Sequence, residues 1–298
     1  MLSTQQETIA GPQGTQLYLE TYGNPQAEQT LLLVHGGLQS LRCFEQQFAP
    51  LSEQAYVIAL DLPYHGQSAV VPSFVQPSPA LWAQGVRAVL EQCQRLDKPL
   101  MILAWSFGGL VTRHYLLTYG QQGVNGLILV GSLFGALSDH QRFLSPLTAQ
   151  VLATMGTPQV LLSERIRAFE LFVGMLTKYP LPPDARDAQY GYNSRAFLHS
   201  LGVSDQWLTE QPWDEMQFLA HLQMPVLLIQ GTDDALVPLD YTRQLARRMP
   251  TAQILEYENS GHSPFLEQPE RFNRDVLTFL STHCESEQAR VRSFGDAA

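Results

Sequence analysis

Short apolar runs recur along the chain, and most of them end beside glycine, histidine, aspartate or serine. Stretches with helical spacing of apolar residues lie between the runs. This alternation is typical of a mostly parallel sheet with helices on both faces, and runs that are apolar throughout indicate strands buried on both sides. The fold class expected is therefore α/β. The expected strands are Thr30–Val34, Tyr56–Leu60, Leu100–Ala104, Leu127–Val130, Val226–Gln230 and Ile254–Tyr257.

Two of the helices can be predicted from the spacing of their apolar residues. The first is entered through Ser78 and Pro79, and the second begins near Pro269. Each apolar stripe predicts the face with which its helix packs against the sheet. The stripes are Trp82, Val86, Val89, Leu90 and Cys93 in the first helix, and Phe272, Val276, Phe279 and Leu280 in the second.

The alternation stops between residues 133 and 222, where helical patterns continue without a clear strand. We interpret this stretch as an inserted helical cap, because a cover over the carboxyl ends of the strands would enclose whatever binds there. A second structural layer without a binding role is the alternative. The predicted division is a core of residues 1–132 and 223–283, a cap of 133–222 and a polar tail of 284–298.

Composition narrows the classes of function. The chain is 45% hydrophobic and 15% charged, which suits a folded globule, and its formal charge of −10 opposes binding to nucleic acid or anionic lipid. No apolar run reaches the roughly 20 residues of a membrane helix, and the polar N-terminus does not resemble a secretory signal. The cysteines Cys43, Cys93 and Cys284 are odd in number and widely spaced, so we expect free thiols and a cytoplasmic location.

A serine stands where the Leu100–Ala104 strand meets the next helix, in the sequence A-W-S-F-G-G at 104–109. A sharp turn that lifts a serine clear of a sheet needs small residues two positions before and after it, because the backbones nearly collide there. Ala104 and Gly108 satisfy that need. The segment resembles the nucleophile elbow of the α/β-hydrolase family, with Ala104 in place of the usual glycine. The resemblance implies that Ser106 is a nucleophile.

Two later loops match the family's order, in which an acid precedes a histidine. The sequence G-T-D-D-A-L-V-P at 231–238 resembles the acid loop and assigns Asp234, with the adjacent Asp233 as an alternative. The sequence S-G-H-S-P at 260–264 is similar to the histidine loop and assigns His262. The interval between the two loops is long enough for one helix and one strand. By this resemblance, His262 accepts the Ser106 proton and returns it to the leaving group, while Asp234 holds the imidazole tautomer.

An oxyanion intermediate needs hydrogen-bond donors that are already in place. The resemblance assigns one donor to the backbone N–H of Phe107, directly after the serine at a helix start. It assigns the other to Gly37, since the loop H-G-G-L at 35–38 resembles the family's oxyanion loop, and Leu38 is the alternative donor. His35 is interpreted as structural.

A serine nucleophile restricts the chemistry that the resemblance implies. Relatives that open epoxides or displace halide place an aspartate at the position of Ser106, and relatives that remove N-terminal proline carry tryptophan at the position of Phe107. We therefore expect hydrolysis of a small or medium carboxylic ester through an acyl-enzyme. Lactonase, thioesterase and perhydrolase activities on the same residues are alternatives.

Two further functions remain open. One is an esterase whose acyl group rides on a carrier protein, although residues 133–222 hold six basic side chains against nine acidic ones where docking would need a basic surface. The other is a ligand receptor that has kept the fold, for which a damaged site residue would be expected and none is found. No nucleotide, flavin or metal motif is recognised, so no cofactor or metal is expected. The oligomeric state is left open.

Overall fold

The computed structural model describes residues 5–283 except 69–70, 73–74, 76 and 201–212. Its centre is an eight-stranded sheet in the order β1-β2-β4-β3-β5-β6-β7-β8. Every neighbouring pair from β4 to β8 is parallel, whereas β2 pairs antiparallel with β1 and β4. The predicted α/β class is therefore confirmed. The strands are β1 (Gln5–Ala10), β2 (Gln16–Tyr22), β3 (Thr30–Val34), β4 (Tyr56–Leu60), β5 (Leu100–Trp105), β6 (Val124–Val130), β7 (Val226–Gly231) and β8 (Ala252–Tyr257).

Each predicted strand lies within an observed one, but β6 begins three residues before its apolar run. The ladder between β5 and β6 shifts register between Leu100 and Met101, so that Leu100 pairs with Val124 and Met101 with Gly126. The shift leaves the polar Asn125 out of the paired positions while keeping it in the strand. An apolar run alone does not predict that the strand begins three residues earlier.

The strands β1 and β2 were not predicted. Most of β1 is exposed at the sheet edge, and its sequence lacks the alternation of a half-buried strand. It is held by the antiparallel ladder that runs from the pair Gln5–Thr21 to the pair Ala10–Gln16. Backbone pairing, rather than burial of apolar side chains, therefore determines this edge of the sheet.

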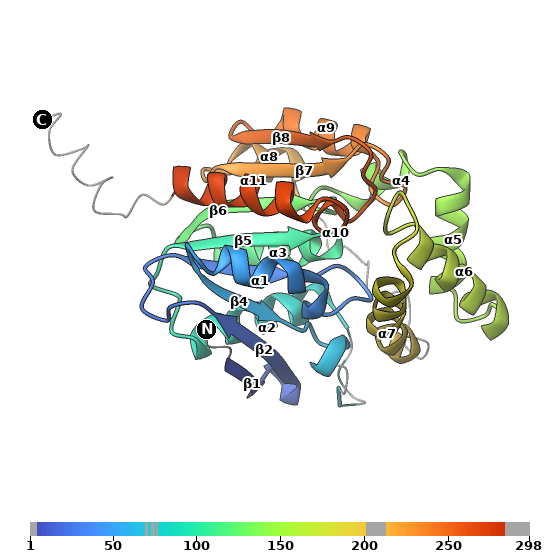
Figure 1. The fold of residues 1–298 in the computed structure, drawn as a ribbon, viewed down its shortest axis with the longest axis horizontal. Coiled ribbons are helices and arrows are strands. Elements are labelled where there is room, and N and C mark those ends of the chain that lie inside the picture. The colour runs from blue at the N-terminus through green and yellow to red at the C-terminus, as the bar shows by residue number, and fades with distance from the viewer. Residues whose placement is uncertain (1–4, 69–70, 73–74, 76, 201–212, 284–298) are drawn as a thin grey trace, which may run out of the picture.

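Helices cover both faces of the sheet, with α1 and α11 on one side and α2, α3 and α9 on the other (Figure 1). Both predicted helical stripes are buried in these two layers, apart from the half-buried Cys93 at the end of the first. The elements outside the cap are α1 (Glu45–Leu51), α2 (Pro79–Gln92), α3 (Phe107–Tyr119), α9 (Leu239–Arg248), α10 (Pro264–Glu267), α11 (Pro269–Thr282) and the 3-10 turns η1 (Pro12–Gly14), η2 (Leu41–Phe44) and η3 (Gly66–Ser68).

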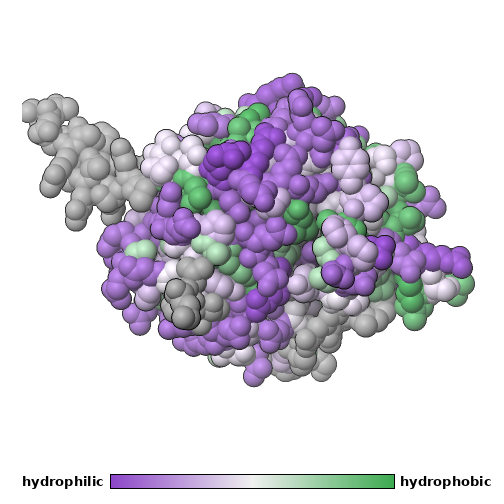
Figure 2. All heavy atoms as spheres, in the orientation of Figure 1, coloured by the Kyte–Doolittle hydropathy of each residue, from purple (hydrophilic) through white to green (hydrophobic). Residues whose placement is uncertain are grey.

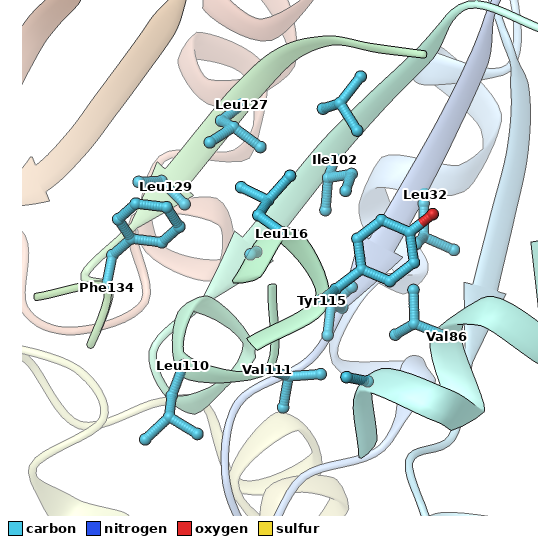
Figure 3. Packing of buried hydrophobic residues seen from close by; sticks show 14 of the residues in the cluster. Leu32, Val86, Ile102, Leu110, Val111, Tyr115, Leu116, Leu127, Leu129 and Phe134 are labelled. Atoms are coloured by element: carbon cyan, nitrogen blue, oxygen red, sulfur yellow. The ribbon is translucent and has the colours of Figure 1, made fainter. Parts of the chain in front are cut away.

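Alternate side chains of the central strands enter two separate apolar clusters, as the pleat requires. Leu32 and Ile102 face α2 and α3, and Figure 3 shows them packed with Val86, Val111 and Leu116. Their neighbours on the same strands point to the opposite face and pack with α1 and α11. A sheet buried on both faces holds its strand ends rigidly, and the predicted site residues lie at those ends.

The region predicted to be a cap, residues 133–222, contains helices. In Figure 1 its helices α5, α6 and α7 lie beyond the carboxyl ends of β5 and β7. Within residues 133–222, the described part contains no strand. Phe169 stacks on Phe197 with ring centroids 4.5 Å apart, and both join the cluster under α1 and α11. The helices are α4 (Leu137–Gln141), α5 (Pro146–Gly156), α6 (Leu162–Gly174), α7 (Pro183–Ser200) and α8 (Glu215–Ala220).

A partly buried ion cluster connects both ends of the predicted cap region to α9. Arg248 Nη1 lies 2.7 Å from Asp139 Oδ2 on α4 and 3.0 Å from Glu215 Oε2 on α8. Gln244 also donates to Asp139 Oδ2 at 2.9 Å. The chain therefore leaves and re-enters the sheet domain beside one helix. The boundaries at 133 and 222 remain predictions, and the polar tail 284–298 lies outside the described residues.

Candidate active site

Ser106 lies at the turn between β5 and α3. Its φ of 53° and ψ of −119° are a conformation that residues with a Cβ rarely adopt. Hydrogen bonds hold the turn on both sides: the Ser106 N–H donates to the Val130 carbonyl at 2.9 Å, and its own carbonyl accepts from Gly109 and Leu133, each at 3.0 Å. Strain of about 1–3 kcal/mol is typical of such a residue, and here it is sustained by bonds to the end of β6 and beyond.

Neighbouring backbones approach this turn closely enough to require glycine. A Cβ at Gly108 would lie 2.4 Å from the Val34 carbonyl oxygen, and one at Gly36 would lie 3.2 Å from Ser106 Cβ. Ala104, where the family usually has glycine, is fully buried and pairs with Val34 in the ladder between β3 and β5. The sheet therefore accommodates the additional methyl group of Ala104, two residues before the serine. At Gly108, two residues after the serine, there is no room for a methyl group.

His262 and Asp234 form a buried hydrogen-bonded pair. The distance from His262 Nδ1 to Asp234 Oδ2 is 2.8 Å, and their side chains are 2% and 0% exposed. Asp234 Oδ1 accepts from the N–H groups of Leu236 and Val237, each at 2.8 Å. The backbone of the loop after β7 thus occupies Oδ1, which leaves Oδ2 to side-chain donors, His262 among them.

Asp233 faces a different partner. Its Oδ2 lies 3.0 Å from Lys178 Nζ and 2.9 Å from Thr232 Oγ1, and its side chain is 39% exposed. The hydrogen bond from Lys178 lowers the pKa of this carboxyl. Of the two adjacent aspartates, only Asp234 contacts the His262 ring in this arrangement.

The residue before Ser106 joins the serine turn to the histidine loop. Trp105 Nε1 donates to the His262 carbonyl at 2.8 Å, and the two rings lie 5.4 Å apart. Gly131, at the end of β6, has a φ of 46°, and a Cβ there would be 3.0 Å from both His262 Nδ1 and Asp234 Oδ2. The structure therefore brings together the ends of β5, β6 and β7 with the loop after β8. Sequence reasoning missed Gly131, although a glycine directly after a buried strand was the available signal.

The loop after β3 meets the start of α3 at Gly37. A Cβ at Gly37 would lie 3.4 Å from Phe107 Cβ, and Leu38 adopts a φ of 63°. The Gln39 N–H donates to the Gly36 carbonyl at 3.3 Å and closes the loop. The two elements predicted to carry backbone donors are therefore neighbours.

His35 is bound away from this site. Its Nε2 accepts from the Leu62 N–H at 3.0 Å, so that Nδ1 carries the proton and donates to the Gly36 carbonyl at 2.7 Å. Burial, reinforced by the nearby His65, holds the pKa of His35 well below its usual range. The ring is therefore neutral, and it ties the loop after β3 to the loop after β4.

Gln39 links the loop after β3 to the cap helix α7. Its Nε2 donates to Asn193 Oδ1 at 2.9 Å, and both side chains are fully buried. Asn193 in turn donates to the Gln189 carbonyl at 2.6 Å. Sequence analysis did not find this link, because it joins residues that are 154 positions apart.

A cavity of about 210 Å³ lies beside this link, between the loops at 40–42 and 61–67 and the helix α7. Arg42 lines it, and the guanidinium is paired with the buried Glu20. Asp61 lines it as well, and burial raises the pKa of its carboxyl to about 6. None of the predicted site residues lines this cavity.

In the part of the chain that the structure describes, no three histidine, cysteine, aspartate or glutamate side chains gather in a way that could hold a metal ion. Over the same ranges, none of the helices has the length and apolarity to span a bilayer. Cys43 and Cys93 are free thiols, whereas Cys284 lies outside the described residues.

The fold agrees with comparisons to known proteins. The model of the alpha/beta hydrolase family matches residues 31–275, which is most of the chain. The chain therefore belongs to the α/β hydrolase family.

The relatives with curated names narrow the class. A pimeloyl-[acyl-carrier protein] methyl ester esterase of Chromobacterium violaceum is 26% identical over 282 residues, covering 89% of this chain and 98% of that protein. A Neisseria meningitidis protein of the same name is 28% identical over 257 residues, with coverage of 83% and 91%. The crystal structure of the esterase RhEst1 from Rhodococcus sp. ECU1013 has 29% identity and a TM-score of 0.77, covering 93% of this chain and 99% of that one. The predicted class, a hydrolase of ester bonds, is confirmed.

Proposed function

We propose that Ser106, His262 and Asp234 are the catalytic triad with which this hydrolase cleaves a small or medium carboxylic ester. The observation that carries the proposal is the buried 2.8 Å hydrogen bond between His262 Nδ1 and Asp234 Oδ2. A histidine held in this tautomer presents Nε2 as a base. The strained turn at Ser106, joined to the histidine loop through Trp105, supports the serine as nucleophile.

In the first half of the reaction, Ser106 Oγ attacks the ester carbonyl carbon while His262 Nε2 accepts the hydroxyl proton. The bond from that carbon to the alcohol oxygen then breaks, and the imidazolium gives its proton to the departing oxygen. Water attacks the acyl-enzyme by the same route, which releases the acid and restores Ser106. Asp234 stays ionised and stabilises the imidazolium throughout.

The backbone N–H groups of Phe107 and Gly37 are the proposed oxyanion donors. The contact between Gly37 and Phe107 supports this pairing, because it lets two elements point donors at one oxygen. The positive end of the α3 dipole adds to the stabilisation. Gly37 has no side chain to obstruct the approach of the substrate.

Residues 133–222 are the proposed cap over this site. The Lys178 N–H donates to Glu267 Oε1 at 2.7 Å, and Lys178 Nζ lies 3.0 Å from both Asp233 Oδ2 and Asn259 Oδ1. These bonds support a cap that crosses the loops carrying the triad acid and base. A cap in that position excludes water and limits the size of the acyl group.

Hydrolysis of p-nitrophenyl acetate and butyrate by the protein and by its Ser106→Ala variant tests the triad. We expect the variant to lose nearly all activity and to resist labelling by a fluorophosphonate, which should add one label to the unchanged protein. Equal rates for the two proteins would contradict the proposal. A turnover that stops near one event per molecule would instead assign a ligand receptor.

The second candidate substrate is an acyl methyl ester on an acyl carrier protein, which the names of the relatives favour. The acidic balance of residues 133–222 opposes docking of an acidic carrier. A direct comparison of kcat/KM on a pimeloyl-carrier methyl ester and on free methyl esters, lactones and thioesters of the same acyl length decides between the two. We expect the free ester to be the better substrate. A preference of more than about tenfold for the carrier-bound ester would reverse that assignment.

The proposed location is the cytoplasm, with an ester rather than nucleic acid as the partner. The formal charge of −10 opposes nucleic acid as a partner, and the free thiols Cys43 and Cys93 support the location. Fractionation of cells that produce the protein should recover it with cytosolic markers. Recovery with secreted or periplasmic markers would contradict the assignment.

A further inference from the structure

Gln230 is a fully buried glutamine on β7, four residues before Asp234. Its Nε2 donates to Asp234 Oδ2 at 2.8 Å. That oxygen is also the one that lies 2.8 Å from His262 Nδ1. The glutamine thus shares the single carboxylate oxygen on which the orientation of the histidine depends.

The direction of the Gln230 amide follows from its neighbours. Its nitrogen faces acceptors only: Asp234 Oδ2, the Val237 carbonyl at 2.8 Å and the Gly231 carbonyl at 3.3 Å. Its oxygen accepts from Thr242 Oγ1 on α9 at 2.6 Å. An amide turned the other way would set its carbonyl oxygen against three acceptors, so the NH₂ group must face Asp234.

All four described contacts to the Asp234 carboxylate are hydrogen-bond donors. Oδ1 accepts from the backbone of the loop, and Oδ2 accepts from Gln230 and His262. The carboxylate is one planar group, so a turn about the Cβ–Cγ bond moves both of its oxygens together. The backbone donors hold the group at Oδ1, and Gln230 adds a donor at Oδ2 that comes from a strand inside the sheet. Without Gln230, His262 would be the one remaining partner of Oδ2 among the described residues.

We propose that Gln230 is a positioning residue for hydrolysis: it holds Asp234 Oδ2 in line with His262 Nδ1, so that His262 Nε2 points at the serine. The proposal rests on the triad proposed above and adds a residue that acts through Asp234 without touching the substrate. Removal of a buried donor to a charged group leaves the carboxylate under-solvated and less firmly held. The cost should fall on kcat, because the substrate does not contact Gln230.

The test compares Gln230→Met with Gln29→Met. Methionine has a similar shape and no donor, and Gln29 is a second buried glutamine, before β3 at the opposite end of the sheet. We expect kcat of Gln230→Met per fluorophosphonate-titrated site to fall about tenfold to hundredfold, with KM changed by less than about twofold. Gln29→Met should keep both constants. The downfield proton resonance of the hydrogen bond between His262 and Asp234 should move in Gln230→Met alone.

An unchanged kcat and proton resonance in Gln230→Met would overturn the inference. If Gln230→Met does not fold, Gln230→Leu, which also lacks a donor, repeats the measurement. If neither variant folds, Gln230 is a structural residue and the inference is overturned as well. Failure of the triad itself is distinguishable, because Ser106→Ala would then retain activity whatever Gln230→Met does.

Discussion

The Asp234 carboxylate and the contact between the sheet domain and α7 satisfy their polar groups differently. Both oxygens of Asp234 accept hydrogen bonds, from the loop, from β7 and from His262. At the contact with α7, the buried Oε1 atoms of Gln39 and Gln189 have no hydrogen-bond partner among the described residues. The carboxylate is therefore held in one geometry, whereas the contact with α7 retains polar capacity that a bound molecule or water could use.

The two regions also differ in their apolar side chains. The central strands are fully buried, while the cap hairpin of α5 and α6 exposes several leucines, which give the apolar rim around these helices in Figure 2. They are Leu147, Leu161, Leu162 and Leu171, each more than half exposed. On the proposed assignment of the site, the well-packed edge of the sheet carries the reacting residues, and the hairpin of α5 and α6 presents apolar side chains to solvent.

The largest effect should come from the acid of the proposed triad. Asp234→Asn keeps the shape but turns an NH₂ group or a neutral oxygen toward His262, which disturbs its tautomer, and kcat should fall by about 10⁴-fold. Asp233→Asn is the matched control, one residue away, and should change kcat by less than about threefold. Steady-state kinetics on p-nitrophenyl butyrate measures both. Similar losses in the two variants would break the assignment of the acid.

A second prediction concerns the packing at the serine turn. Gly108→Ala sets a Cβ 2.4 Å from the Val34 carbonyl oxygen, so that a strand or helix must move. We expect a loss of about 3 kcal/mol in the free energy of unfolding, measured by urea denaturation, and a large loss of activity. If Gly108→Ala kept the free energy of unfolding of the unchanged protein, the turn at Ser106 would have room for a Cβ at this position, and the prediction would be wrong.

A third prediction tests whether the cap communicates with the oxyanion loop. Gln39→Ala and Asn193→Ala each break the 2.9 Å bond between that loop and α7, and each should lower kcat about threefold to tenfold. In the double variant the loss should not exceed that of the worse single variant, because both remove the same contact. Losses that multiply would show that the two residues act separately.

The smallest expected effect is on stability and comes from a substitution in the predicted cap. It should raise the free energy of unfolding, whereas Gly108→Ala should lower it. Gly191 lies in α7, and a Cβ there would meet no atom within 4 Å. Gly191→Ala should therefore raise the free energy of unfolding by about 0.5–1 kcal/mol, since alanine is the better helix former. Urea denaturation beside Gly108→Ala gives the contrast directly. A destabilised variant would mean that α7 packs more tightly than its open surface indicates.

Much of the fold could be predicted because its central strands are apolar on both faces and its helices carry one apolar stripe. The edge strand β1 could not, because exposed residues leave no periodic pattern. The first residues of β6 could not be predicted either, because the polar Asn125 interrupts the apolar run of that strand. The strand β2 was missed although it is buried, because polar residues such as Glu20 and Thr21 interrupt its apolar pattern. The failures thus fall where polar residues break the apolar pattern of a strand.

The candidate site divides in the same way. Ser106, Asp234 and His262 stand in local motifs that resemble loops of the family, so the sequence could propose all three. The resemblance favoured Asp234 but left Asp233 open, because adjacent positions on a loop differ only in the direction of their side chains. The structure turns one toward His262 and the other toward Lys178.

By itself, the sequence determined a mostly parallel sheet, the insertion of a helical region and the order of serine, acid and histidine, since each depends on local patterns of a few residues. The tertiary structure alone decided which aspartate meets the histidine, where Gln230 and Gly131 enclose that pair, and how Gln39 meets α7. These contacts join residues on different elements, and their geometry follows from strand register and loop packing rather than from any local spacing.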